Sequence, residues 1–114
     1  MGNYWVGADN FNGGITSLPE SFKNLSNLES LSLNNNQITN LPDSIGNLIK
    51  LDYLELDENK LTSLPESITN IPYFYYLSMG GNHLYCTDSE ANPPQWLIDY
   101  CQNFCFGLDA QYCP

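Results

Sequence analysis

The sequence predicts an α/β fold, a short right-handed solenoid with a parallel β-sheet on its concave face and short helical or 3₁₀ segments on its convex face. Three observations support this prediction. A unit of 23 residues recurs at a constant offset, leucines within each unit alternate with polar residues, and all four cysteines lie between residues 86 and 113. A chain of 114 residues has the length of one domain.

The repeat is clearest in the middle of the chain. Residues 28–50, LESLSLNNNQITNLPDSIGNLIK, and residues 51–73, LDYLELDENKLTSLPESITNIPY, align without a gap, and FYYLSMGGNHLYC begins the same pattern at residue 74. One unit upstream, residues 5–27 form a first copy whose second half, ITSLPESFKNLSN, fits well and whose first half, WVGADNFNGG, fits poorly. No single unit can bury its apolar stripe, so the copies are expected to stack.

Each position of the unit has a physical role. Two leucines separated by one polar residue, such as Leu31 and Leu33, predict a strand with one buried face. Apolar residues three positions apart, such as Ile45 and Leu48, predict one helical or 3₁₀ turn that faces inward. An asparagine follows each strand, where its side chain can bond free backbone groups at the turn: Asn36, Asn59 and Asn82.

These residues resemble the leucine-rich repeat family, in the class with the pattern L-x-x-L-x-L-x-x-N-x-(I/L)-x-x-L-P-x-x-(I/F)-x-x-L, over residues 5–86. The first copy departs from this pattern, because Ala8 and Asn10 occupy leucine positions and Gly13 occupies the asparagine position. The resemblance implies three regions. These are a degenerate N-terminal half-repeat or cap (1–14), repeats (15–86, in the register 5–27, 28–50, 51–73 and a partial 74–86) and a C-terminal capping segment (87–114).

The capping segment is expected to cover the apolar end of the last repeat with a helix. Asn92 is the expected helix cap, Pro93 the first helical residue and Gln95 the partner in a capping box. Gly107 is the expected stop. One continuous helical face would then carry Trp96, Leu97, Tyr100, Cys101, Phe104 and Cys105.

Three interpretations of the cysteines compete. A zinc site would draw four ligands from His83 and the cysteines, but the intervening lengths of 14, 3 and 7 residues match no common zinc module. A catalytic thiol needs a base, and His83, the only histidine, stands in no recognisable motif. Structural disulfides fit the even number and terminal clustering best, and the segment resembles the cysteine-bearing C-terminal caps of extracellular leucine-rich repeat proteins. The residues concerned are Cys86, Cys101, Cys105 and Cys113.

Four cysteines allow three connectivities, and the sequence leaves them open. Cys101–Cys105 is disfavoured, because a pair four residues apart within one helix has unfavourable Cβ directions. Disulfides imply an oxidising compartment, so the protein is expected to be secreted or at the cell surface, although residues 1–11, MGNYWVGADNF, lack the features of a signal peptide.

The charge limits the classes of partner. Thirteen acidic residues against three basic ones give a net charge of −10, which argues against nucleic acid and against an anionic membrane surface. No window is long and apolar enough for membrane insertion. A protein partner with a basic surface fits the sign of the charge, and the chain itself is expected to be a monomer.

The resemblance implies that the concave sheet binds a protein through its non-leucine positions. These are Ser30, Ser32, Asn34, Asn35, Tyr53, Glu55, Asp57, Glu58, Tyr76 and Ser78, with Gly80 and Gly81 in the fourth copy and Gly7, Asp9, Phe11 and Asn12 in the degenerate first. Aromatic residues beside carboxylates are typical of contact hot spots. Two other interpretations of the carboxylates remain. One is that they serve only the solubility of the sheet. The other is that Glu55 and Asp57 hold Ca²⁺ loosely, although no rigid acidic loop surrounds them.

The sequence therefore predicts a non-catalytic, extracellular protein-interaction module without a cofactor or metal. No nucleophile motif, phosphate loop or pair of acids in a plausible cleft is present. One alternative is a structural spacer, or the C-terminal fragment of a longer protein with its binding surface elsewhere. The other is a glycan-binding module that uses Tyr53 and Tyr76 with nearby carboxylates and amides.

Overall fold

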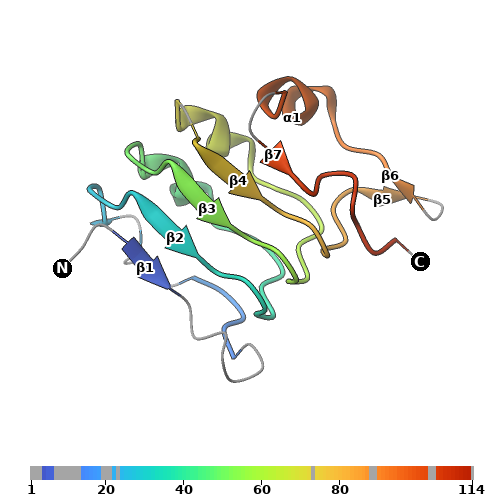
Figure 1. Ribbon diagram of the computed structural model, residues 1–114, viewed down its shortest axis with the longest axis horizontal. Helices are drawn as coiled ribbons and strands as arrows, with labels where there is room; N and C mark the ends of the chain where they lie inside the picture. Colours follow the sequence, from blue (N-terminus) through green and yellow to red (C-terminus); the bar gives the residue numbers. More distant parts are fainter. Residues whose placement is uncertain are drawn as a thin grey trace.

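The strands of successive repeats pair side by side into one parallel sheet. The computed structural model describes residues 4–6, 14–18, 22, 24–72, 74–87, 90–102 and 105–113. Its main sheet runs in the order β1 (Tyr4–Val6), β2 (Ser30–Ser32), β3 (Tyr53–Glu55), β4 (Tyr76–Ser78) and β7 (Cys105–Phe106) (Figure 1). Leu31 lies opposite Leu54, and Leu54 opposite Leu77, so each coil advances by one repeat. The predicted solenoid is confirmed.

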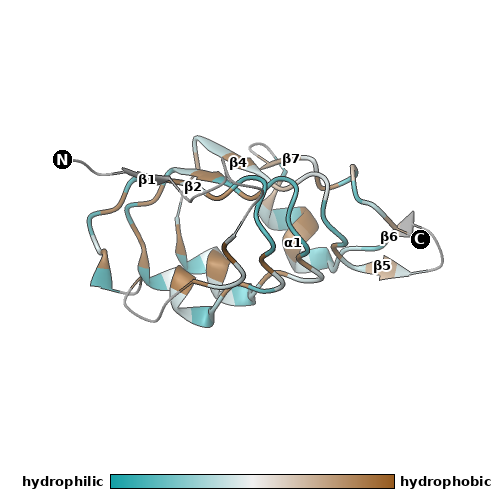
Figure 2. Ribbon diagram, turned by 90° about the horizontal axis from the view of Figure 1, so that it is seen from below, coloured by the Kyte–Doolittle hydropathy of each residue, from teal (hydrophilic) through white to brown (hydrophobic). Residues whose placement is uncertain are grey.

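Short 3₁₀ helices form the opposite side of the coil. They are η3 (Asp43–Asn47) and η4 (Glu66–Asn70), and each follows a proline whose backbone is extended. Proline lacks an amide hydrogen and has a fixed φ, so it cannot continue strand pairing and is suited to the position before a 3₁₀ helix. In η3 the amide of Ile45 donates to the carbonyl of Pro42, which is the spacing of a 3₁₀ turn. Figure 2 shows the strands along one side of the molecule and these turns along the other.

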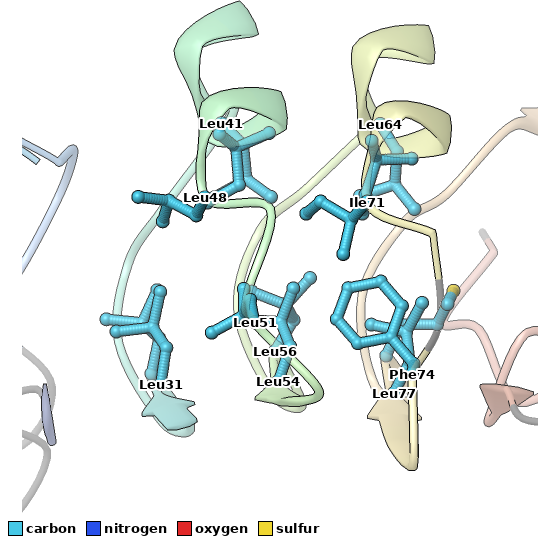
Figure 3. Packing of buried hydrophobic residues seen from close by; sticks show 14 of the residues in the cluster. Leu31, Leu41, Leu48, Leu51, Leu54, Leu56, Leu64, Ile71, Phe74 and Leu77 are labelled. Atoms are coloured by element: carbon cyan, nitrogen blue, oxygen red, sulfur yellow. The ribbon is translucent and has the colours of Figure 1, made fainter. Parts of the chain in front are cut away.

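The core fills the space between the strands and the 3₁₀ helices. Leu31, Leu54 and Leu77 project inward from the sheet, and all three have no exposed surface. Leu48 and Ile71, which close the 3₁₀ turns, face them from the other side and are equally buried (Figure 3). Burial of a leucine side chain contributes about 1.5–3 kcal/mol. The core thus runs continuously through the coils.

The asparagines form a hydrogen-bonded ladder inside the turns. Asn59 Oδ1 accepts the amide of Ile38 at 3.1 Å, and Nδ2 donates to the carbonyls of Leu33 and Leu56 at 2.9 and 3.1 Å. Asn82 makes the three corresponding bonds one coil later. One coil earlier, Asn36 accepts the amide of Ile15 and donates to the carbonyl of Leu33. Each amide satisfies backbone groups that the turn leaves without ladder partners, so the role predicted for asparagine is confirmed.

The first strand lies in a different register from the expected one. A constant repeat would place Ala8 opposite Leu31, but the structure pairs Trp5 with Leu31, a separation of 31 − 5 = 26 residues. The repeat length is restored at Ile15, whose amide bonds Asn36 as the amide of Ile38 bonds Asn59. Tyr, Trp and Val favour strands, whereas Ala, Asn and Gly do not, and this preference accounts for the shift.

The capping helix is shorter than predicted. Helix α1 comprises Gln95–Tyr100, and its N-cap is Pro94, which makes no side-chain capping bond. The expectation that Asn92 caps the helix and Pro93 begins it is wrong, because a residue that precedes proline is disfavoured in helical geometry. The side chain of Gln95 donates to Asp99 within the helix instead of closing a capping box. The next strand, β7, begins at Cys105.

Both disulfides lie between residues 86 and 113. Cys86, in a small hairpin of β5 (Cys86–Thr87) and β6 (Glu90–Ala91), bonds Cys113, and Cys101 bonds Cys105. The argument against Cys101–Cys105 is wrong, because Cys105 lies in β7 and not in the helix that ends at Tyr100. All four cysteines are paired, so no thiol is left for zinc or for catalysis. In the described part of the chain, no helix has the length and apolar character needed to cross a bilayer.

Candidate functional site

The register of the sheet brings the predicted contact residues into two rows on the concave face. One row contains Ser30, Tyr53 and Tyr76, and the other contains Ser32, Glu55 and Ser78. Within each strand these residues flank the central buried leucine and are more accessible than it, except for Ser78. Ser78 is only 2% exposed and offers little surface to a partner.

Aromatic rings from three strands stack across this face. The ring centroids of Tyr53 and Tyr76 are 5.0 Å apart with an angle of 21° between the planes. Phe106, from β7, continues the stack at 5.0 Å from Tyr76 with an angle of 29°. Phe106 is 54% exposed. Tyr53 and Tyr76 are partly exposed, so the three rings form a partly exposed aromatic surface on the concave face.

The sequence pattern did not indicate Phe106 as a contact residue, because the spacing of apolar residues predicted a helix that included its neighbour Cys105. In the structure, Cys105 takes the place opposite Leu77 and Phe106 the place opposite Ser78. The available signal was an amide residue, Gln111, six positions after Cys105, since Asn82 follows Leu77 by five positions. β7 lies beside β4 as a further coil of the sheet (Figure 1).

The carboxylate of Glu55 is held in place by two hydroxyl groups. Ser32 Oγ donates to Oε1 at 2.6 Å, and the Tyr53 hydroxyl donates to Oε2 at 3.1 Å. Partial burial raises the pKa of the Tyr53 phenol, and its hydrogen bond to the Glu55 carboxylate raises that pKa further. The phenol therefore stays protonated and continues to donate near neutral pH, which keeps the carboxylate in one orientation.

Two of the predicted contact residues join neighbouring coils. Asn34 Oδ1 accepts the amide of Asp57 at 2.8 Å, and Asp57 Oδ1 accepts the amide of Gly80 at 2.7 Å. These side chains follow the ends of the strands and bond backbone groups of the next coil. Their structural role occupies acceptor atoms that a partner or a Ca²⁺ ion would otherwise use.

The positions that follow share a left-handed backbone. The φ angles of Asn35, Glu58 and Gly81 are 61°, 59° and 69°. Asparagine and glycine tolerate this conformation well, and glutamate less so. Glu58 Oε2 accepts the hydroxyl of Tyr112 at 3.0 Å, which joins the C-terminal segment to the third repeat.

The remaining predicted positions carry less information. Gly7, Asp9, Phe11 and Asn12 lie outside the described residues. Among the residues that the structure describes, no three His, Cys, Asp or Glu side chains are arranged to hold a metal ion. The concave face thus combines a stack of rings, one oriented carboxylate and a rim of acidic side chains that are bonded to neighbouring coils.

Comparison with known proteins agrees with this architecture. The family model described as leucine rich repeat matches residues 10–61. A solved leucine-rich repeat protein from Leptospira interrogans is 34% identical with a TM-score of 0.67, and the match covers 79% of this chain and 22% of that one. No match was found among curated proteins.

The strands, asparagines and 3₁₀ turns recur from coil to coil, so the class of protein is a solenoid repeat protein with a parallel sheet along one face. The repeat pattern, the fold and both matches show that this chain belongs to the leucine-rich repeat family. The chain spans about a fifth of the length of the Leptospira protein, since the match covers 22% of it.

Proposed function

We propose that this chain is a protein-interaction module that binds its partner with the concave face. The observation that carries the proposal is the partly exposed stack of Tyr53, Tyr76 and Phe106 across three strands. Rigid aromatic side chains supply large contact areas at low cost in conformational entropy, and they are enriched in binding hot spots. Leucine-rich repeat proteins are generally not enzymes, so a binding role is proposed for this face.

The partner is proposed to present a basic surface. The chain has a net charge of −10, and Glu55, Asp57 and Glu58 all lie on or beside the concave face. Opposite charge on a partner would accelerate association and would select against acidic proteins. The proposed working state of this chain is a monomer that uses one face of its sheet.

The compartment is proposed to be extracellular, either secreted or at the cell surface. Two disulfides support this placement, because thiols stay reduced in the cytosol of most organisms. Intact mass after alkylation without reductant, on protein from its native source, tests the proposal. Unmodified cysteines support it, and four alkylated cysteines would overturn it.

The concave face is tested by comparing partner capture by the wild-type chain and by the triple variant Tyr53→Ala, Tyr76→Ala, Phe106→Ala. A matched control is Ile49→Ala, since Ile49 is 57% exposed but follows η3 on the other side of the coil. A protein captured by the wild type and by the control, and lost with the triple variant, supports the proposal.

Equal capture by all three proteins would contradict the concave-face proposal, provided that circular dichroism shows the triple variant to be folded. A glycan array provides the second arm of the test. Binding to glycans that the triple variant abolishes, with no protein captured, would replace the protein-interaction proposal by the glycan-binding alternative.

A further inference from the structure

The aromatic stack ends at Tyr53, and the next position in the row, on β2, is the small residue Ser30. In the row of Ser30, Tyr53 and Tyr76, the last two positions carry stacked rings, and the first carries a serine. Tyr76 stacks on one face of the Tyr53 ring. On the side toward β2 the neighbouring position in the register is Ser30, and Tyr4 of β1 follows one strand further. Neighbouring strands are about 4.8 Å apart, which is close to the thickness that one further flat group would occupy.

An oriented carboxylate lies beside this open position. Glu55 Oε1 is bonded to Ser32 of β2, so the carboxylate leans toward the strand that also carries Ser30. A carboxylate has about four lone-pair sites on its two oxygens, and the hydroxyls of Ser32 and Tyr53 fill one on each oxygen. One acceptor site therefore remains on each oxygen, which suits a donor with two parallel N–H groups.

Among the described residues, no lysine side chain is paired with Glu55, whose hydrogen-bond partners are Ser32 and Tyr53. The ten predicted contact residues and Phe106 include neither lysine nor arginine, and the sequence contains no Lys or Arg after Lys60. Lys50 Nζ donates to Asn27 Oδ1, outside both rows of the concave face. The charge of Glu55 is thus available to a cation that arrives with a partner.

We propose that the concave face recognises an arginine side chain of the partner protein, with its guanidinium flat against the open face of Tyr53 and paired through two N–H groups to Glu55. This inference rests on the proposed function and names the group that the face binds. Guanidinium is planar, stacks on aromatic rings and forms two parallel bonds to a carboxylate. The ammonium of lysine shares the charge but not the plane or the paired donors.

The stack and the carboxylate act together in this site. Tyr53 supplies the ring face and also bonds Glu55, so one residue fixes both halves of the recognition. Tyr76 stacks on Tyr53 and Phe106 stacks on Tyr76, so these two rings hold the Tyr53 ring on the side toward the C-terminal coil. The C-terminal coil therefore contributes to the rigidity of the site without contacting the guanidinium.

The test uses three blocked pentapeptides that differ only in the central residue, which is arginine, lysine or citrulline, in a glycine background. Binding is followed by NMR through the backbone amides of residues 30–32 and 53–55 and the ring protons of Tyr53. We expect the arginine peptide to bind about five- to tenfold more tightly than the lysine peptide, and the uncharged citrulline peptide to bind more weakly than either.

Two variants and two controls locate the site. Glu55→Gln and Tyr53→Leu should each remove the preference for arginine. Glu66→Gln, which makes the same change of charge on η4, and Tyr75→Leu, which removes an exposed ring outside the stack, should preserve it. Equal affinity for arginine and lysine peptides, or an arginine preference that survives Glu55→Gln, would overturn the inference.

The peptide titration needs no partner, so its outcome is separable from that of the partner capture. Capture that depends on the concave face, together with peptides that show no arginine preference, would leave the interaction module in place and overturn only the arginine site. An arginine preference whose NMR shifts map away from β2 and β3 would overturn it as well.

Discussion

Gln111 takes the place that asparagine occupies in the other coils: its Oε1 accepts the amide of Leu84 at 3.0 Å, as Asn82 Oδ1 accepts the amide of Leu61 at 3.0 Å. Nε2 of Gln111 donates to the carbonyl of Met79 at 2.9 Å, which matches the bond from Asn82 to Leu56 one coil earlier. The C-terminal segment is therefore a further coil of the solenoid, built with an amide that is one methylene longer.

The ladder predicts a graded loss of stability. Asn59→Ala removes one acceptor and three donor contacts inside the turn, so we expect the free energy of unfolding to fall by about 3–5 kcal/mol. Gln111→Ala removes the same kind of contact in the terminal coil, where we expect a loss of about 1–2 kcal/mol. Urea unfolding measures both values.

The control for the ladder is Asn40→Ala. Asn40 is exposed, and among the described residues its side chain forms one hydrogen bond, a long one of 3.5 Å to the neighbouring Thr39 hydroxyl. Its replacement should therefore change stability by less than about 0.5 kcal/mol. If Asn59→Ala were no more costly than Asn40→Ala, the ladder would not be a source of stability.

The central repeats could be predicted from the sequence because each position of the repeat carries the same type of residue in several copies. The alternation of Leu54 and Leu56 around a polar residue, and the asparagine that follows, recur in each coil, so an error in one copy is corrected by the others. Of the concave positions, Ser30, Ser32, Tyr53, Glu55 and Tyr76 follow directly from this register.

The two ends of the chain could not be predicted in the same way, because no second copy constrains them. Consecutive prolines, Pro93 and Pro94, delay the helix and let Cys105 enter a strand, against the helical spacing of apolar residues. Phe106 joins the aromatic stack only because of this change. At the other end, Trp5 replaces Ala8 opposite Leu31, which follows from strand preference and not from repeat length.

A second prediction concerns the contact between η3 and η4. A Cβ atom at Gly46 would fall against the carbonyl oxygen of Ser67 and 3.0 Å from its carbonyl carbon, and neither backbone atom can move without displacing η4. We expect Gly46→Ala to lower the free energy of unfolding by about 1–3 kcal/mol. Thermal or urea denaturation measures the change.

Gly14→Ala is the matched control for this contact. A Cβ atom at Gly14 would have no atom within 4 Å, so the substitution should be neutral or should stabilise by up to about 1 kcal/mol, because it reduces the entropy of the unfolded chain. A Gly46→Ala variant as stable as Gly14→Ala would show that the 3₁₀ helices are not in direct backbone contact.

A third prediction separates the two disulfides. Cys86–Cys113 joins residues 27 apart in sequence, whereas Cys101–Cys105 joins residues 4 apart. In the chain-entropy description, these loops correspond to about 3.5 and about 2 kcal/mol of stabilisation. Paired replacement by serine at 86 and 113 should therefore lower stability more than paired replacement at 101 and 105. The opposite order, measured by urea unfolding, would contradict the assignment.

A fourth prediction follows from Tyr100, whose burial raises its pKa from 10.0 to about 12. Its hydroxyl donates to the carbonyl of Ile71, and its ring meets Phe74 edge-on, with the centroids 6.4 Å apart. The folded state favours the neutral phenol, so the stabilising effect is complete below pH 10, the unfolded value, and is lost as the pH rises toward 12. At about pH 11 the loss should be about 1 kcal/mol, after allowance for the exposed part of the ring.

Tyr100→Phe isolates this contribution, because Tyr53, Tyr85 and Tyr112, whose pKa values are also raised, remain in both proteins. The variant should be less stable than the wild type at neutral pH, since it lacks the bond to Ile71. Between about pH 9 and 11 the wild type should lose more stability than the variant, so the difference between them should narrow. A difference that stays constant over this range in urea unfolding would show that the Tyr100 phenol has the same pKa in the folded and unfolded chains.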